Sequence, residues 1–220
     1  MTDQTYSADT IRRFAGITTA SIADAVEQQG ERGYLDGRIR QMLPGQGRLV
    51  GPAVTVLEVP ADDAGGPAHA LQAIDESPAG SVLCIAAGGA DVAAFGGLMA
   101  AGMVVNKLAG VVVDAGVRDN EEIARDYPQL PVYAASRVAA TTVGRIRTVS
   151  RNEPVELGGV TVHPGDLIVA DSDGVVRVPA ALVQAVLEAA ELIEQREAEQ
   201  TRLILETGSL RGGIEKYGRV

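Results

Sequence analysis

Two apolar segments, each of a length suited to a strand, flank a longer segment with a helical pattern. SVLCIAA (residues 81–87) and GVVVDA (residues 110–115) are almost continuously hydrophobic, which is typical of strands buried on both faces of a sheet. The residues between them predict a helix over about residues 90–108. A strand, a helix and a second strand in this order form a β–α–β unit with parallel strands. The chain is therefore predicted to have an α/β fold.

Further elements of the same kind extend over the rest of the 220 residues, which favours a single domain, 1–220. The last element is a long helix over residues 180–208, whose second half is heavily charged. Such a helix is expected to contact a neighbouring subunit rather than lie in the core. The other predicted helices cover residues 17–30, 67–77 and 119–127, and the other predicted strands cover residues 49–59, 131–136, 144–150, 160–162, 167–171 and 174–179.

Charge and composition exclude several classes of function. The formal charge of −10 argues against a nucleic-acid partner, because binding to phosphates relies on clustered Lys and Arg. The sequence shows neither a signal peptide nor an apolar run long enough to cross a membrane, so a cytoplasmic protein is expected. The single cysteine, Cys84, lies inside the first apolar segment and is interpreted as a buried hydrophobic residue.

The apolar strand that ends near residue 117 is followed by a cation and an anion, Arg118 and Asp119. The carboxyl ends of parallel strands are where ligands bind in open α/β sheets. The Arg side chain offers a fork of donors for a carboxylate, and the Asp offers an oxygen ligand for Mg²⁺ or Mn²⁺. The alternative is a solvated Arg beside an Asp that caps the following helix.

A pair of glycines, Gly96 and Gly97, interrupts the predicted helix of residues 90–108. Glycine is unfavourable inside a helix, so the pair is interpreted as the true helix start or as a close backbone approach. A helix that begins here presents the free N–H groups of Gly96 to Met99, including that of Leu98, to an anion. The alternative is close packing of helix against sheet. The chain order places these amides beside Arg118 and Asp119, which together predict a carboxylate cradle next to a metal ligand.

Other ionisable residues give weaker signals. His69 and His163 are far apart in sequence, which disfavours a histidine metal site or a Ser-His-Asp triad. Asp91 is a second candidate base, with helix capping as the simpler account. Asp114 supports the site or is a turn residue, and the sequence leaves both open. Lys107 is interpreted as a cation at a helix C-terminus rather than as a Schiff-base lysine.

The sequence resembles the RraA-like family over most of its length. The similar segments are TTASIADAV, LVGPAVTVLEV, PAGSVLCIAAGG, FGGLMAAGMVVNKLAGVVVDAGVRD, VTVHPGDLIVADSDGVVRVP and EKYGRV. This family includes the 4-hydroxy-4-methyl-2-oxoglutarate aldolases, with an oxaloacetate decarboxylase side activity, and the regulator of ribonuclease activity A. The resemblance implies a swivelling β/β/α fold, assembled as a homotrimer or a dimer of trimers with sites between subunits.

The resemblance also implies roles for individual residues. The carboxylate and keto oxygen of a small 2-oxo acid would be held by the amides of Gly96 to Met99 and by Arg118. Asp119 would bind Mg²⁺ or Mn²⁺ directly. A glutamate of the neighbouring subunit's C-terminal helix, Glu197 or Glu199, would support the metal through water. Arg118 and Asp119 are thus the implied catalytic residues.

Gly97 departs from the aldolase pattern, which has an acidic residue 21 positions before the Arg. In the aldolases that carboxylate orients a water that exchanges a proton with the enolate. The ribonuclease regulators also lack it, but they typically lose the Asp after the Arg as well, whereas this chain keeps Asp119. The expected function is a metal-dependent carbon–carbon lyase of the pyruvate type, an aldolase or decarboxylase. The alternatives are a non-catalytic regulator or binding protein, or a relative with an altered substrate.

Overall fold

The computed structural model describes residues 6–43, 45–62 and 65–217. The last three residues of the EKYGRV segment, 218–220, lie outside the described residues. The helices are α1 (Ala8–Ala15), α2 (Thr19–Gln28), α3 (Ala68–Glu76), α4 (Gly97–Val105), α5 (Asn120–Asp126), α6 (Val183–Thr207) and α7 (Leu210–Tyr217), with a short 3₁₀ turn at Ala180–Leu182. The strands are β1 (Arg40–Gln41), β2 (Leu49–Pro60), β3 (Val82–Ala86), β4 (Ala93–Phe95), β5 (Gly110–Val117), β6 (Val132–Arg137), β7 (Ile146–Arg151), β8 (Val155–Leu157), β9 (Val160–Val162), β10 (Leu167–Ala170) and β11 (Val175–Val178).

One large sheet runs through the molecule in the order β1-β6-β5-β3-β2-β10-β11, with β4 paired to β5 and β7 paired to β2. Its centre is parallel, because β2, β3, β5 and β6 all pair in the parallel sense. The strands β3 and β5 are buried along their whole length, as their continuous hydrophobicity predicts. The predicted α/β fold is therefore confirmed.

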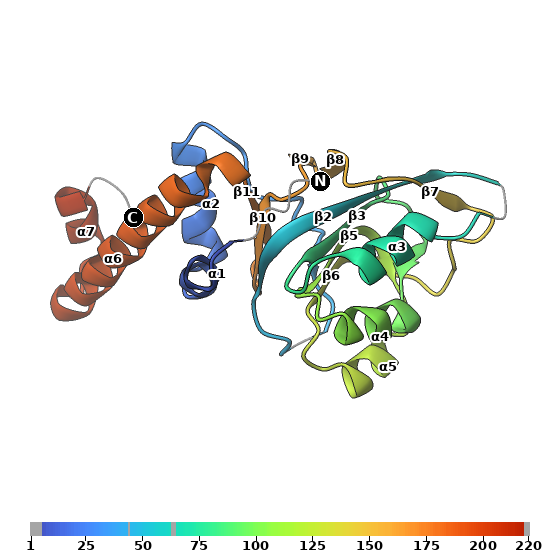
Figure 1. Cartoon of the computed structure of the whole chain (residues 1–220). Helices are drawn as coiled ribbons and strands as arrows, with labels where there is room; N and C mark the ends of the chain where they lie inside the picture. The colour runs from blue at the N-terminus through green and yellow to red at the C-terminus, as the bar shows by residue number, and fades with distance from the viewer. Residues whose placement is uncertain (1–5, 44, 63–64, 218–220) are drawn as a thin grey trace.

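Three groups of buried side chains form the core. Helices α3, α4 and α5 cover one face of the sheet (Figure 1), where Ile74, Met103 and Ile123 pack against the strands. The β8–β9 hairpin and the segment around Leu35–Ile39 cover the opposite face. Helices α1, α2 and α6 pack against β10 and β11. The sheet with its covering helices therefore holds the carboxyl ends of β4 and β5 in a fixed position.

The long C-terminal helix, α6, contacts α2 with its first half and then extends away from the sheet together with α7 (Figure 1). A bidentate ion pair between Arg13 and Glu191, with N–O distances of 2.7 Å, fastens it to α1. Farther along the helix, Leu205 is 81% exposed. Among the described residues, no helix is both long and apolar enough to cross a membrane.

The predicted helix over residues 90–108 is wrong in its first part. Residues 93–95 form strand β4, in which Ala93 pairs with Gly116 and Phe95 pairs with Val117 of β5. All three residues of β4 are buried. Pairing and burial therefore outweigh the helical preference of the two alanines. Gly96 continues the extended backbone, and α4 begins only at Gly97.

Candidate functional site

The candidate site lies where β4 and β5 end side by side. Because these strands are parallel neighbours, the glycines that follow β4 and the Arg-Asp pair that follows β5 meet at the same edge of the sheet. The backbone N–H of Arg118 donates to the carbonyl oxygen of Phe95 at 3.1 Å and joins the two segments. The structure thus brings Gly96, Gly97, Arg118 and Asp119 together.

Asp119 has a left-handed backbone conformation, with φ 59° and ψ 31°, an arrangement that Asp tolerates better than most residues. Its side chain makes no capping bond to α5, which it precedes. Instead its Oδ2 accepts the N–H of Gly97 at 3.0 Å, so the carboxylate caps α4. Asp119 therefore caps α4, which precedes it in the sequence. The alternative that its side chain caps the following helix, α5, is wrong.

Gly96 is explained by the close approach of this Arg-Asp pair. A Cβ atom on Gly96 would lie 2.9 Å from Asp119 Oδ2 and 3.2 Å from Arg118 Cγ. The first distance is too short for a real contact, so a larger residue would displace the carboxylate. The glycine thus lets both side chains lie against the backbone at the start of α4.

Three sets of hydrogen-bond donors surround the start of α4. The N–H of Gly97 is already engaged by Asp119, but within the described residues the amides of Leu98 and Met99 have no acceptor. The Arg118 side chain is 45% exposed, and its Nε lies 3.7 Å from Asp119 Oδ2. Its fork of N–H groups makes no hydrogen bond to the residues that the structure describes. The arrangement offers two backbone donors and a guanidinium to one anion.

Asp119 also fits a divalent metal, although the ligand set from one chain is small. Oδ2 is used by Gly97, while Oδ1 accepts no hydrogen bond from the described residues, and the side chain is 39% exposed. Mg²⁺ commonly keeps several waters and binds one or two carboxylates plus its substrate, so one open carboxylate oxygen suits it. Over the described ranges, no group of three or more His, Cys, Asp or Glu side chains is placed to hold an ion.

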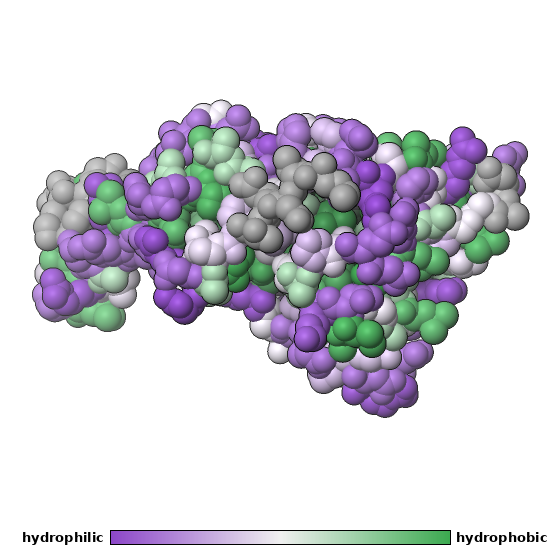
Figure 2. All heavy atoms as spheres, viewed as in Figure 1, coloured by the Kyte–Doolittle hydropathy of each residue, from purple (hydrophilic) through white to green (hydrophobic). Residues whose placement is uncertain are grey.

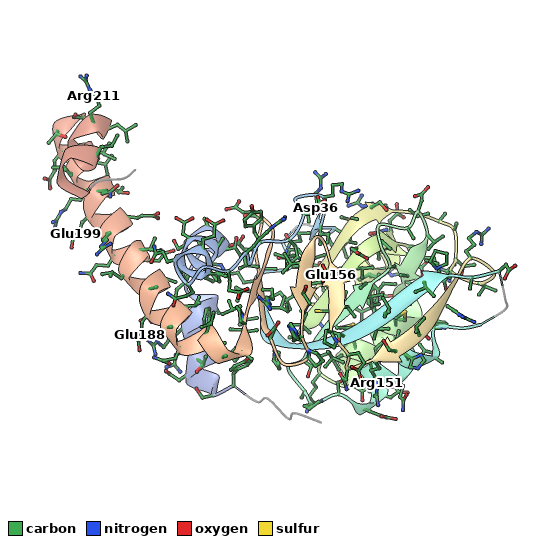
Figure 3. All side chains as sticks on the ribbon, turned by 90° about the horizontal axis from the view of Figure 1, so that it is seen from above. Asp36, Arg151, Glu156, Glu188, Glu199 and Arg211 are labelled. Atoms are coloured by element: carbon green, nitrogen blue, oxygen red, sulfur yellow. The ribbon has the colours of Figure 1, made fainter. Side chains whose placement is uncertain are left out.

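The other two predicted metal-supporting residues lie elsewhere in the same chain. Glu197 and Glu199 belong to the distal half of α6, and Figure 3 shows Glu199 on the helical extension, away from the sheet. Asp119 directly precedes α5 in the chain, and α5 lies beside α4 on one side of the sheet (Figure 1). A single chain therefore does not bring either glutamate to Asp119.

The structure adds one acidic residue that the sequence analysis missed. A Cβ atom on Gly97 would lie 3.0 Å from Glu122 Oε1 and 3.2 Å from Glu122 Cδ. The Glu122 carboxylate thus occupies the space that a side chain at residue 97 would take. The available signal was the spacing, because residues three apart at a helix start lie on one face, and Glu122 follows Asp119 by three.

Two further carboxylates are buried. Asp114 is 7% exposed and accepts the backbone N–H of Ala87, with further backbone bonds from the glycines of the turn after β3 and from Gly158. Burial raises its pKa, and the backbone bonds oppose that shift. Asp114 therefore lies within β5 and is not itself a turn residue, although its carboxylate holds the glycine turn that follows β3. Glu58 is 3% exposed, and neither carboxylate oxygen has a hydrogen-bond partner within the described part of the chain. Burial, with the nearby charge of Asp114, raises the pKa of Glu58 to about 7.

The weaker candidates lie apart from the cradle. Cys84 is fully buried, as predicted, and burial raises the pKa of its thiol. His69 shares a hydrogen bond with Thr148, and His163 lies near Asp166. Asp91 precedes β4 rather than α4, so the helix-capping account of this residue is wrong.

The cradle is open to solvent in a single chain. Two hollows of about 830 and 230 Å³ lie elsewhere, and neither is lined by the Gly96–Met99 segment or the Arg-Asp pair. Leu98, at the cradle, is 91% exposed, and Val105, two turns later on α4, is 78% exposed. Figure 2 shows a hydrophobic patch over the region of α4. The first turn of α4 thus presents an apolar side chain beside polar donors.

The chain belongs to the RraA-like family. The family model, described as Aldolase/RraA, matches residues 19–177. It is 31% identical over 214 residues to a Halalkalibacterium halodurans protein that is named provisionally as a 4-hydroxy-4-methyl-2-oxoglutarate aldolase. The match covers 94% of this chain and 95% of that protein.

Two other proteins are similar to this chain, one in sequence and one in structure. The chain is 30% identical over 191 residues to protein DlpA of Legionella pneumophila, covering 84% of this chain but only 30% of DlpA. The chain thus spans less than a third of that relative. The crystal structure of RraAS2 from Streptomyces coelicolor, described as an unusual member of the RNase ES inhibitor RraA family, matches with a TM-score of 0.82 at 26% identity. It covers 90% of this chain and 99% of that one. The swivelling β/β/α fold of the RraA type is thereby confirmed.

Proposed function

We propose that the protein is a divalent-metal-dependent carbon–carbon lyase, an aldolase or decarboxylase, that acts on a small 2-oxo acid. The observation that carries the proposal is the convergence of Arg118, Asp119 and the amides of Leu98 and Met99 around Gly96. A 2-oxo acid has a carboxylate beside a keto oxygen, and these are the two groups that a cation and a row of N–H donors recognise. The similarity to a protein named as an aldolase supports the same reaction class.

Each residue of the cradle has a distinct task in this proposal. Arg118 neutralises the substrate carboxylate with its open fork of donors. The amides of Leu98 and Met99 donate to the substrate oxygens that gain negative charge as the carbon–carbon bond breaks. Gly96 leaves room for the Arg118 and Asp119 side chains, because a Cβ atom there would meet both of them. The cradle thus both orients the acid and stabilises the charge that cleavage produces.

Asp119 is the residue that would hold the metal, Mg²⁺ or Mn²⁺, through its second carboxylate oxygen. When bound, a divalent ion supplies a Lewis acid for the keto oxygen. The capping bond from Gly97 fixes the orientation of the carboxylate through Oδ2 and leaves Oδ1 without a hydrogen-bond donor among the described residues. In this proposal one side chain, that of Asp119, both caps α4 and binds the metal.

A neighbouring subunit completes the site in this proposal. The cradle is open in one chain, Leu98 beside it is exposed, and the distal half of α6 projects away from the sheet with α7 (Figure 1). A homotrimer, or a dimer of trimers, would bring Glu197 or Glu199 of another copy to the metal through water. We also expect the protein to be cytoplasmic. Sedimentation of the purified protein tests the assembly.

The decisive experiment measures oxaloacetate decarboxylation with Mg²⁺ or Mn²⁺. We expect turnover by the wild type, and a loss of about 100-fold or more in Asp119→Ala, because the metal loses its protein ligand. The sequence offers a matched control in a second Arg-Asp pair, Arg125-Asp126, whose Asp side chain is also 39% exposed. Asp126→Ala should retain full activity. A wild type that is no faster than buffer with metal would contradict the proposal.

A non-catalytic regulator is the second candidate. Gly97, in place of the aldolase acid, favours it, as does the structural similarity to a protein of the RNase ES inhibitor family. The retained Asp119 favours the enzyme. A stoichiometric protein partner in a pull-down, together with no turnover of 2-oxo acids, would support the regulator.

A further inference from the structure

The carboxylate of Glu122 lies over the bare α-carbon of Gly97, one residue from the centre of the cradle. Its Oε1, Cδ and Oε2 lie 3.0, 3.2 and 3.4 Å from the position of a Cβ atom on Gly97. The side chain comes from the first turn of α5, one turn after Asp119, and is exposed to solvent. Gly97 itself is buried and donates its N–H to Asp119. Glu122 and Asp119 therefore approach the same glycine, one at its α-carbon and the other at its nitrogen.

The proposed reaction needs a group that exchanges protons with the substrate. When the C3–C4 bond of oxaloacetate breaks, CO₂ leaves and the electron pair stays on C3, so one proton must be added to C3 to give pyruvate. Arg118 does not release its proton in proteins. Asp119 is engaged by the N–H of Gly97 and by its proposed metal. Of the ionisable side chains that contact Gly96 and Gly97, Glu122 is the one left for this task.

We propose that Glu122 is the catalytic proton carrier of this site, and that it fills the place that Gly97 leaves open. This inference rests on the proposed lyase function. In decarboxylation the Glu122 carboxyl group gives its proton to C3, directly or through one water, and regains a proton from solvent. In retro-aldol cleavage its carboxylate takes the hydroxyl proton from a 4-hydroxy-2-oxo acid as the C3–C4 bond breaks, and returns that proton to C3. Each turnover leaves the side chain in its starting state.

The test moves the carboxylate from residue 122 to residue 97. Glu122→Gln should lower kcat for oxaloacetate about 100-fold, the usual range for a lost general acid, with little change in KM. The double variant Gly97→Asp, Glu122→Gln should recover most of that loss. Glu121→Gln is the matched control, because Glu121 is exposed on the same turn and does not contact Gly97. It should behave as the wild type.

A second measurement tests the placement of the carboxylate without substrate or metal. In urea unfolding without added metal, Gly97→Asp should lower the midpoint more in the wild-type background than in Glu122→Gln, because two adjacent carboxylates repel each other whereas the Gln amide carries no charge. Equal shifts in the two backgrounds would overturn the placement.

The outcomes separate the two proposals. A wild type that cleaves oxaloacetate while Glu122→Gln remains equally fast would overturn the inference alone. A wild type without turnover would overturn the lyase function and the proton-carrying role with it. Loss of activity in Glu122→Gln that Gly97→Asp does not restore would also count against the inference, since a structural role would give that result.

Discussion

The exposed carboxylates of Asp119 and Glu122 contrast with the buried carboxylates of Glu58 and Asp114. Asp119 keeps 39% of its side chain in solvent, whereas Glu58 as a whole residue is 3% exposed. An exposed carboxylate keeps its charge at little cost, but a buried one must be hydrogen-bonded or protonated. Asp114 takes the first course through four backbone donors, whereas burial of Glu58, which is unpaired within the described residues, raises its pKa to about 7. The difference teaches that the acidic pair proposed to act on a ligand is separate from the acidic pair whose burial bears on stability.

The largest expected effect on stability comes from Asp114, which is the hydrogen-bonded residue of the two buried carboxylates. Asp114→Ala should lower the free energy of unfolding by about 4 kcal/mol, because several buried backbone N–H groups in the turn after β3 lose their acceptor. Asp114→Asn keeps a side-chain oxygen and should lose less. Urea unfolding measures both variants. A loss below about 1 kcal/mol in Asp114→Ala would show that water replaces the carboxylate there.

The ionisation of Glu58 should make the free energy of unfolding depend on pH. Its pKa in the folded protein, about 7, lies above its ordinary value of 4.5, so the folded state binds the proton more tightly than the unfolded state. The stabilisation is fully present below about pH 4.5 and is lost as the pH rises through about 7, with a total of about 3 kcal/mol.

Glu58→Gln should remove this slope and be more stable than the wild type at about pH 8. Urea unfolding over a series of pH values tests it, with exposed Glu121→Gln as the control. If the free energy of unfolding of Glu58→Gln still depends on pH in the same way, other ionisable groups cause that dependence.

The smallest of these effects should come from the exposed pair. Asp119→Ala removes the cap of α4 and should lower the free energy of unfolding by about 1 kcal/mol, although it removes the proposed metal site entirely. Thermal unfolding of Asp119→Ala beside Asp126→Ala measures the difference. A loss larger than that of Asp114→Ala would erase the distinction between the two pairs.

The sequence predicted the features that depend on periodic patterns. The buried strands β3 and β5 follow from their apolar runs, and the meeting of Gly96–Gly97 with Arg118-Asp119 follows from the parallel order of the strands. Strand β4 was missed, because its alanines favour a helix and the strand is selected by long-range pairing, chiefly with β5. The direction of the Asp119 side chain was also beyond the sequence, since it depends on one left-handed backbone angle.

The burial of Glu58 could not be predicted for a related reason. In the sequence it stands near the end of a strand, where a polar residue is ordinarily solvated. The antiparallel partner β7 pairs with that end of β2 and places Glu58 opposite Thr148, which removes the carboxylate from water. Long-range pairing of this kind leaves no mark in a local pattern.

The capping bond from Gly97 to Asp119 has a consequence for how quickly the protein could take up and release an ion. Because the Gly97 N–H orients the Asp119 carboxylate, binding of an ion at the proposed site would require no rearrangement of the backbone and little loss of side-chain freedom. Exchange of the ion should then be limited by the loss of water from the ion itself.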